Sequence, residues 1–192
     1  MKEAIRYGVA RGLFCNESGL GSAPIVAAAA QTRNPIRQAL VASPGKFWDA
    51  VVVCAVTGIV LVNSGEWLKG LKGAALTNAA FADIPAVGPI VLTVGLLTFV
   101  FSTIIGWSYY GEKAAEYLFG VGAILPYRVL WVAVAMIGST LSLSIVWSLA
   151  DITNGLMAIP NLVSLLWLNR VIVEETKHYL WEERFDEPFR NK

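Results

Sequence analysis

Residues able to bind a small cation lie together in the longest uncharged stretch of the chain, from Ile84 to Gly111. Within it, Phe99, Ser102 and Thr103 occupy positions i, i+3 and i+4, which share one face of a helix. The two hydroxyls and the main-chain carbonyl of Phe99 would provide three oxygen ligands, the type that hard cations such as sodium prefer. The alternative is that the hydroxyls bond to carbonyls of their own helix or pack against a neighbouring helix.

A second polar pair lies in the last long apolar stretch. Asp151 is the one charged residue among the 41 residues from Val129 to Asn169, and Asn154 follows it one helical turn later. An ionisable side chain within a membrane helix is a functional candidate, because a charge in hydrocarbon is costly. The alternative is that Asp151 caps the start of a span at the water interface.

A segment with polar side chains and several glycines lies near the start of the chain (RGLFCNESGLGSAP, 11–24). Its glycines and proline disfavour a regular helix. Asn16 or Ser18 is suited to cap a helix start, and the alanine-rich run 27–31 is a good helix former. We predict a broken backbone at the mouth of a membrane bundle; the alternative is an ordinary loop with a good helix cap. Glu17 either binds an ion or gates a pathway, or it bonds to the backbone of its own segment.

The sequence contains no constellation typical of an enzyme. No nucleophile–base pair stands out, no Cys/His cluster has metal-ligand spacing, and no phosphate-binding loop occurs. We therefore expect no catalytic activity, no cofactor and no metal site beyond the one for sodium. His178 lies among acidic residues and is interpreted as a solvated surface histidine. The formal net charge of +1 gives nucleic acid binding no electrostatic basis.

The composition places the chain in a lipid bilayer. Hydrophobic residues make up 56% of the chain, and the mean hydropathy is +0.58. Soluble domains contain roughly 45–50% apolar residues. Charge-free runs long enough to cross a bilayer predict an all-α membrane protein with four transmembrane helices. The expected spans are about 47–65, 86–110, 129–144 and 148–168.

The third and fourth spans are separated by an expected reversal. A single helix over 129–169 would be about 60 Å long, twice the roughly 30 Å of the hydrocarbon core. The chain must therefore fold back, and the polar residues from Ser139 to Thr153 are the expected place. Asn154-Gly155 and Pro160-Asn161 are expected to loosen the fourth span.

The remaining segments are assigned by charge. Residues 1–46 form a basic segment that cannot span a bilayer, 66–83 form a connector with a short helix, and 170–192 form a charged tail. Of the 15 Lys and Arg residues, 13 fall on one side of the four-span arrangement. The excess of positive charge on cytoplasmic loops then predicts that both termini are cytoplasmic.

The signature Gly12-Leu-Phe-Cys-Asn-Glu-Ser-Gly-Leu-Gly-Ser-Ala-Pro24 closely resembles that of the alanine/glycine:cation symporters, the sodium–alanine symporter family. The family pattern is Gly-x-Phe-Ser-Asn-Glu-Ala-Gly-x-Gly-Ser-Ala-Pro. This chain departs from it at Cys15 and Ser18, and both changes keep a small side chain. Two further segments match, 99–113 (FVFSTIIGWSYYGEK) and 150–166 (ADITNGLMAIPNLVSLL), so the resemblance covers nearly the whole chain.

The resemblance implies the leucine-transporter architecture of two inverted five-helix repeats. The four spans would be helices seven to ten of that fold, and the missing helices one to six would hold most contacts to the amino acid, so no substrate-binding residue is predicted here. The eighth helix of this architecture supplies a carbonyl and two hydroxyls to a sodium site, which implies that role for Phe99, Ser102 and Thr103. The signature would close the inner pathway from the cytoplasmic side. Its residues with that implied role are Asn16, Glu17, Gly19, Gly21 and Ser22.

The resemblance also implies a function. The chain would be the C-terminal part of a secondary transporter in the plasma (inner) membrane that couples sodium entry to uptake of a small neutral amino acid, alanine or glycine. The alternative is a membrane-embedded structural or assembly fragment without transport of its own. The sequence does not determine whether alanine or glycine is carried or whether the coupling ion is sodium or a proton. It also does not determine the stoichiometry or the oligomeric state.

Overall fold

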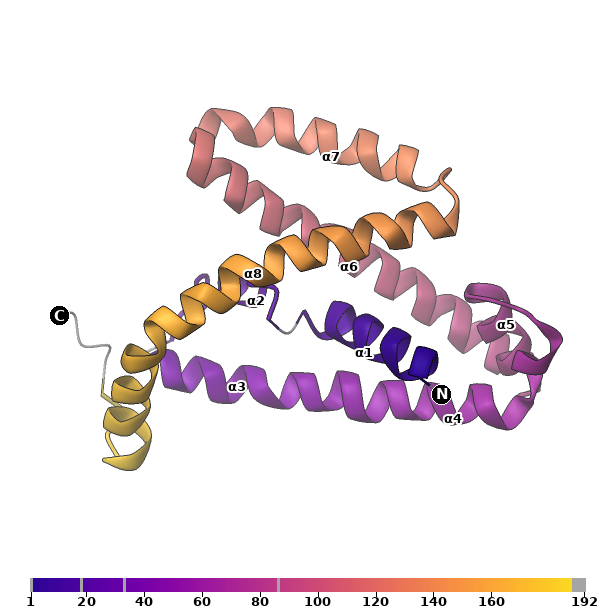
Figure 1. Cartoon of the computed structure of the whole chain (residues 1–192), viewed down its shortest axis with the longest axis horizontal. Coiled ribbons are helices and arrows are strands. Elements are labelled where there is room, and N and C mark those ends of the chain that lie inside the picture. Colours follow the sequence, from indigo (N-terminus) through magenta and orange to yellow (C-terminus); the bar gives the residue numbers. More distant parts are fainter. Residues whose placement is uncertain (1, 18, 33, 86, 188–192) are drawn as a thin grey trace. The chain divides into compact units, whose positions relative to one another are not determined.

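A computed structural model describes residues 2–17, 19–32, 34–85 and 87–187, and every regular element in them is a helix (Figure 1). Four helical runs are long and apolar enough to cross a membrane, in agreement with the expected number. Their most apolar stretches are not buried within this chain. The four runs are Pro35–Ser64, Gly88–Phe119, Val121–Gly138 and Leu143–Trp181.

The chain divides into two compact units, which are described separately. The α4–α6 unit comprises residues 48–124. The α1–α8 unit comprises residues 1–47 and 125–192.

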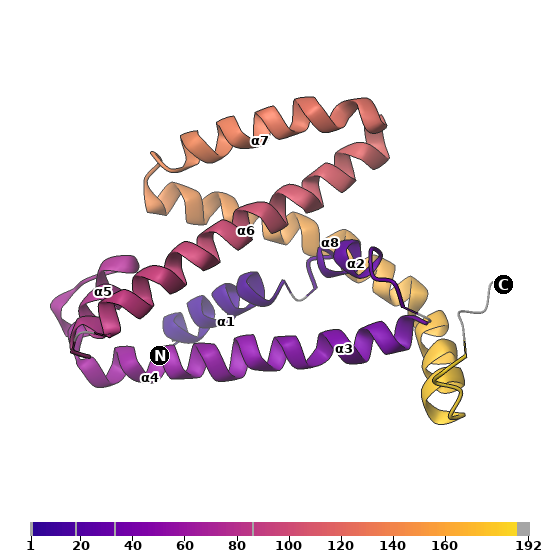
Figure 2. The ribbon, with the colours of Figure 1, turned by 180° about the vertical axis from the view of Figure 1, so that it is seen from behind.

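The α4–α6 unit contains two short helices followed by a long one. A π-helical turn, Trp48–Val53, leads into α4 (Cys54–Ser64). Gly65 ends α4 in the left-handed conformation, with φ 68°, as is usual for glycine after a helix. A 3₁₀ turn, Glu66–Lys69, precedes α5 (Ala74–Ala82), so the connector does hold a short helix. α5 contacts both α4 and α6 (Figure 2).

Helix α6 (Gly88–Phe119) is longer than the expected span. At 1.5 Å per residue its 32 residues extend about 48 Å, beyond the roughly 30 Å hydrocarbon core. Good helix formers follow the apolar run, so the helix continues as far as Gly120, where φ is 81°. Its start requires a glycine, because a Cβ on Gly88 would lie 2.0 Å from the carbonyl oxygen of Phe81.

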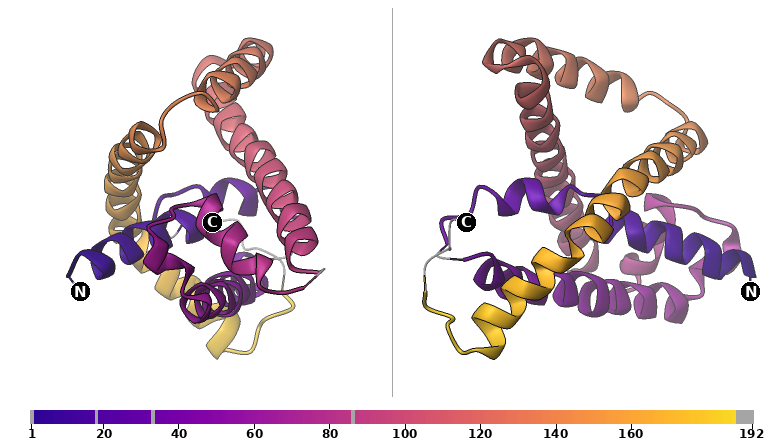
Figure 3. Two further views of the ribbon diagram at one scale, coloured as in Figure 1. Left: turned by 90° about the vertical axis from the view of Figure 1, so that its right-hand side faces the viewer. Right: turned by 60° about the vertical axis from the view of Figure 1, so that its left-hand side comes forward.

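The α1–α8 unit contains four helices of at most 15 residues and ends with one long helix of 34 residues. In Figure 3, α1 lies beside the first half of α8. A 3₁₀ turn, Val121–Ala123, precedes α7, and a π-helical turn, Lys177–Trp181, follows α8. The α-helices of the unit are α1 (Lys2–Asn16), α2 (Ala23–Ala27), α3 (Pro35–Phe47), α7 (Ile124–Gly138) and α8 (Leu143–Thr176).

The reversal between α7 and α8 lies at the start of the expected interval. The hydroxyls of Ser139 and Thr140 donate to carbonyls of the last turn of α7, each at 2.7 Å. Ser142 is extended, with φ −65° and ψ 142°, and α8 begins directly after it. The third helical run therefore ends at Gly138 and not at 144, and the fourth begins at Leu143 and not at 148.

Two expectations about α8 are wrong. Asp151 lies about two turns inside the helix, so it does not cap the start of a span. The helix also continues without interruption through Asn154-Gly155 and Pro160. A proline removes one main-chain donor, and the surrounding turns of a membrane helix can keep their own bonds despite that loss.

The boundaries of the two flanking segments also differ from expectation. Residues 35–46 are helical and continue into the first apolar run, because Pro35 suits the first turn of a helix and Pro44 is tolerated inside it. At the other end, the helical run passes position 170 and ends at Trp181. His178 is not a solvated histidine, since its side chain is 17% exposed and its ring packs edge-on against buried Tyr179.

Candidate functional site

The predicted sodium ligands lie on one face of α6. The Ser102 hydroxyl donates to the Phe99 carbonyl at 3.0 Å, and the three residues are exposed in this chain. Neighbouring Thr93 and Thr98 likewise donate to carbonyls one turn earlier, each at 2.7 Å. Such bonds are common for hydroxyls in membrane helices. They leave lone pairs on the Ser102 hydroxyl and on the carbonyl, so both oxygens keep the capacity to accept a cation.

The second half of the signature segment is broken, as Gly19 and Gly21 predict, whereas Gly12 lies inside α1. Helix α1 ends at Asn16, and the backbone then takes positive φ at Glu17 (52°), Gly19 (80°) and Gly21 (84°). Positive φ is readily adopted by glycine and costs other residues energy, which explains the two glycines. Ser18 lies outside the described residues.

Asn16 does not form the expected cap of a helix start. The Asn16 amide donates to the Gly12 carbonyl at 3.2 Å, so it closes the last turn of α1 and caps no helix start. Ser22 stands at the cap position of α2, but its side chain makes no cap bond there. The helix itself spans Ala23–Ala27 and not the run 27–31, because Pro24 suits its first turn.

A hydrogen bond from a buried serine joins the two ends of the break. Ser22 is 1% exposed, and its hydroxyl donates to Oε2 of Glu17 at 2.6 Å. The Glu17 carboxylate therefore bonds to a side chain five residues away. The expected alternative, a bond from this carboxylate to its own backbone, is absent from the hydrogen bonds of the described residues.

The break also approaches α8 and α3 of the same unit. A Cβ on Gly21 would lie 3.1 Å from Oδ1 of Asn161, which leaves little room for a larger residue. The Lys46 ammonium group donates to the Asn16 carbonyl at the end of α1. The glycine at position 21 is thus favoured both by its φ and by this close approach.

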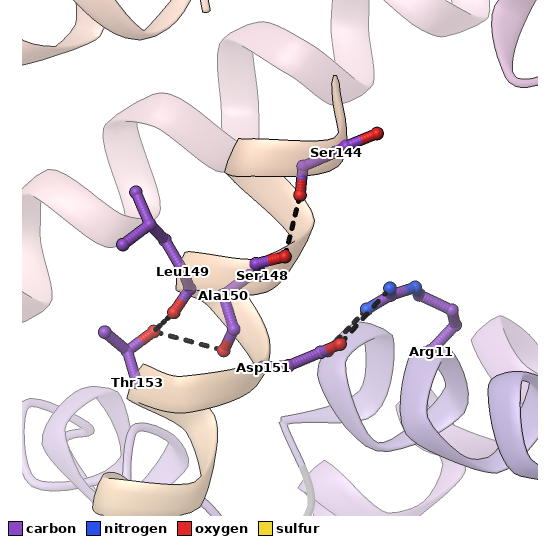
Figure 4. Close-up of polar contacts among 7 residues, drawn as sticks. All are labelled: Arg11, Ser144, Ser148, Leu149, Ala150, Asp151 and Thr153. Atoms are coloured by element: carbon purple, nitrogen blue, oxygen red, sulfur yellow. Dashed lines mark hydrogen bonds and ion pairs between the residues drawn. The ribbon is translucent and has the colours of Figure 1, made fainter. Parts of the chain in front are cut away.

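Asp151 has a charged partner on α1. Arg11 Nη1 lies 2.6 Å from Asp151 Oδ1, and Nη2 lies 3.5 Å from Oδ2 (Figure 4). The guanidinium carbon lies 3.7 Å from the ring centroid of Trp147, one turn before Asp151. Phe14 packs edge-on against the same indole at 5.9 Å. Asp151 is therefore part of a cluster of charged and aromatic side chains that joins α1 to α8.

A cavity of about 470 Å³ lies between α1, the break and α8. Small and aliphatic residues form most of its wall, together with the carboxylate of Asp151 and the amide of Asn154. The lining residues are Arg6, Tyr7, Ala10, Leu13, Gly19, Leu20, Asp151, Asn154, Gly155, Ala158 and Leu162.

The sequence-predicted residues thus lie in two places. The candidate ligands Phe99, Ser102 and Thr103 are in the α4–α6 unit, and the signature residues lie with Asp151 and Asn154 in the α1–α8 unit. In the part of the chain that the structure describes, no group of three or more His, Cys, Asp or Glu side chains is arranged to hold a metal ion.

Comparison with known proteins identifies the family. The model of the sodium:alanine symporter family matches residues 1–190. The chain belongs to the sodium:alanine symporter family. This confirms the resemblance drawn from the signature, and it places the chain among membrane transport proteins rather than enzymes.

Relatives in this family include transporters from bacteria and an archaeon. The chain is 53% identical over 180 residues to a sodium/alanine symporter, AgcS, of Methanococcus maripaludis, covering 92% of this chain and 40% of that protein. It is equally similar, with the same coverage, to an uncharacterized transporter of Haemophilus influenzae. It is 34% identical over 177 residues to the amino-acid carrier protein AlsT of Bacillus subtilis, covering 91% of this chain and 38% of that protein. The chain spans about 40% of the length of these relatives, and no solved structure matches it.

Three residues of this sodium:alanine symporter chain make long-range contacts that were not predicted from the sequence: Arg11, Trp147 and Asn34. A signal for Arg11 was available, because an acid in a membrane helix needs a partner and Arg11 lies at the start of the signature. A signal for Asn34 was also available in the Asn34-Pro35 pair, which is typical of a helix start. No comparable local pattern marks Trp147.

Proposed function

We propose that this chain is the C-terminal, four-span part of a symporter that couples sodium entry to uptake of a small neutral amino acid, alanine or glycine. The observation that carries the proposal is the family match over residues 1–190 together with 53% identity to a sodium/alanine symporter. The amino acid and sodium are cargo, and no resident cofactor is proposed.

In this proposal, α6 provides the coupling-ion ligands: the Phe99 carbonyl and the hydroxyls of Ser102 and Thr103. Support comes from their common helix face and from the 3.0 Å bond between Ser102 and the Phe99 carbonyl, which brings two oxygens together. The remaining ligands of a complete sodium shell would come from helices outside this chain.

The four spans would correspond to helices seven to ten of an inverted-repeat transporter, and helices one to six would be supplied by the rest of the protein. Both termini would be cytoplasmic and the membrane would be the plasma (inner) membrane. The distribution of 13 of 15 Lys and Arg residues to one side supports this orientation.

The signature residues would form part of the gate on the cytoplasmic side. The break at positions 17, 19 and 21 allows the end of α1 to move without unfolding a helix. The Ser22–Glu17 bond would hold the closed conformation. The residues proposed for this role are Asn16, Glu17, Gly19, Gly21 and Ser22.

Coupling would follow from thermodynamic linkage. If sodium and the amino acid stabilise the same conformation of the transporter, each raises the affinity for the other. A sodium gradient then drives uptake without direct contact between the α6 ligands and the signature.

The test is uptake of labelled alanine and glycine into proteoliposomes with and without an inward sodium gradient. The chain would be reconstituted alone and joined to the preceding helices of a family member. We expect sodium-driven uptake by the joined form only. Uptake by neither form would contradict the proposal and favour an assembly or structural role. Uptake by the chain alone would contradict the expectation that helices outside this chain hold most contacts to the amino acid.

A further inference from the structure

Helix α1 and one stripe of residues on α8 form facing walls of a cavity. The α8 residues that line the cavity recur at helical spacing: Asp151, Asn154, Gly155, Ala158 and Leu162. Trp147, which contacts Arg11 of α1, lies one turn before Asp151 on the same face. The cavity and the ion pair therefore belong to one surface of α8, and α1 forms the facing wall.

The contact between α1 and this surface is held by Arg11. Its guanidinium bonds to both oxygens of Asp151, at 2.6 and 3.5 Å, and stacks over Trp147 at 3.7 Å. An arginine can make these two contacts together, since its planar group offers a fork of donors and a flat face. The side chain of Arg11 is 29% exposed and that of Asp151 is 47% exposed, so water can replace each partner.

The C-terminal end of α1 joins the rest of the unit through the break. Glu17, Gly19 and Gly21 have positive φ there, and the two glycines allow the backbone to rotate at low cost. A rigid helix attached through such a segment can swing as a body, with the break as its hinge.

We propose that α1 is a lid over the α1–α8 cavity and that the Arg11–Asp151 pair, stacked on Trp147, is its latch. Separation of the pair widens the opening of the cavity to water, and its formation narrows that opening. The hinge is shared with the proposed signature gate, and the inference goes beyond the proposed function because the latch residues belong neither to that gate nor to the proposed ion ligands.

The test measures water access to the cavity in the full chain, purified in detergent micelles. Cys15 and Cys54 are changed to serine, and Ala158→Cys provides a thiol on the cavity wall. The rate of alkylation by a water-soluble maleimide then reports opening. Ile152→Cys, at a position 61% exposed and not among the cavity-lining residues, serves as the reference probe.

We expect Arg11→Gln to raise the alkylation rate at position 158 on the order of tenfold, because an ion pair and an aromatic contact are lost together. Asp151→Asn should raise the alkylation rate less, because the guanidinium of Arg11 still stacks over Trp147. The double variant should not exceed Arg11→Gln alone, and the exchanged pair Arg11→Asp with Asp151→Arg should return the rate toward that of the parent. The matched control, Arg170→Gln with Glu174→Gln, removes an exposed ion pair elsewhere on α8 and should leave the rate unchanged.

Unchanged rates in the Arg11 and Asp151 variants would overturn the latch. An equal rise with the control pair would overturn it as well. A parallel rise at both probe positions would mean general loosening of α8 rather than movement of a lid, and would also contradict the proposal.

Discussion

Hydroxyls in both units bond to carbonyls of their own helix, as those of Ser102 in α6 and Ser148 in α8 do, and the two units differ in their longer-range polar contacts. In the α4–α6 unit, the hydroxyls of Thr57, Thr93, Thr98 and Ser102 bond to carbonyls of their own helical run. In the α1–α8 unit, polar side chains join residues far apart in the sequence. Arg11 and Asp151 are 140 positions apart, and Asn34 and Phe185 are 151 positions apart.

This difference separates positions that hold the structure from positions that are available for binding. A hydroxyl bonded within its own helix needs no partner elsewhere, so its remaining lone pairs can serve an ion without loss of packing. A polar group that joins two distant segments is different, because its removal breaks a contact between those segments and, where the partner is buried, leaves that partner unsatisfied. We therefore expect substitutions to affect stability in the α1–α8 unit and ion dependence in the α4–α6 unit.

The largest effect on stability is expected at Asn34, which is 2% exposed. Its amide donates to the carbonyls of Phe185 and Glu187, and its oxygen accepts from the Arg37 main chain at the start of α3. Asn34→Ala should lower the free energy of unfolding by about 2 kcal/mol, from the lost helix cap and the unsatisfied carbonyls. SDS unfolding in mixed micelles would measure it.

The control for Asn34 is exposed Asn63, near the end of α4. Asn63→Ala should change the free energy of unfolding by less than about 0.5 kcal/mol. Equal losses at the two positions would remove the distinction between the units.

Two serines, one in each unit, are expected to differ in their contribution to the free energy of unfolding. Ser22→Ala removes the donor to the Glu17 carboxylate and should cost about 1.5 kcal/mol of unfolding free energy. Ser102→Ala removes a bond within α6 at an exposed position and should cost less than about 0.5 kcal/mol. Both variants would be measured by the same unfolding assay, and a larger loss at Ser102 would reverse our interpretation.

A smaller effect is expected at Gly21, where φ is 84°. Gly21→Ala should lower the free energy of unfolding by about 1 kcal/mol, because alanine is disfavoured at this φ and its Cβ would approach Asn161. Gly12→Ala is the control, since Gly12 lies inside α1 and a Cβ added there would have no neighbouring atom within 4 Å. That change should be neutral or slightly stabilising in the same assay.

The smallest effect concerns a local ion pair in the connector of the α4–α6 unit. A hydrogen bond to Glu66, together with the charge of Glu66, raises the pKa of Lys69 from its ordinary value of 10.5. Because this pKa is raised on folding, the stabilisation is present below pH 10.5 and is lost as the pH rises through the folded-state pKa. Glu66→Gln should return the Lys69 pKa toward 10.5 in an NMR titration, and an unchanged pKa would exclude Glu66 as its cause.

Much of the architecture could be predicted from the sequence, because its causes are local. Four apolar runs indicated the number of long helices, the glycines at 19 and 21 indicated the break, and the length of 129–169 required a reversal. The ends of the helices were less predictable. Serine and threonine hydroxyls end α7 early at Gly138, and good helix formers carry α6 past the apolar run.

The contacts within the α1–α8 unit could not be predicted in the same way. No local pattern pairs Arg11 with Asp151, or Asn34 with the residues after α8, because such pairs depend on how segments fold back on each other. His178 was misjudged for this reason, since the chain after α8 brings Glu187 to 3.6 Å from its ring. The candidate ion ligands remain a prediction from spacing and from family resemblance.

The most direct test of the ion site is the sodium dependence of alanine uptake by the joined form after Ser102→Ala with Thr103→Ala. We predict that the sodium concentration for half-maximal uptake rises about tenfold or more, the equivalent of about 1.4 kcal/mol of lost ion binding. Thr93→Ala, which removes a hydroxyl from another part of α6, should leave the sodium dependence unchanged. An unchanged sodium dependence in the Ser102 and Thr103 variant would contradict the assignment of the ion site to α6.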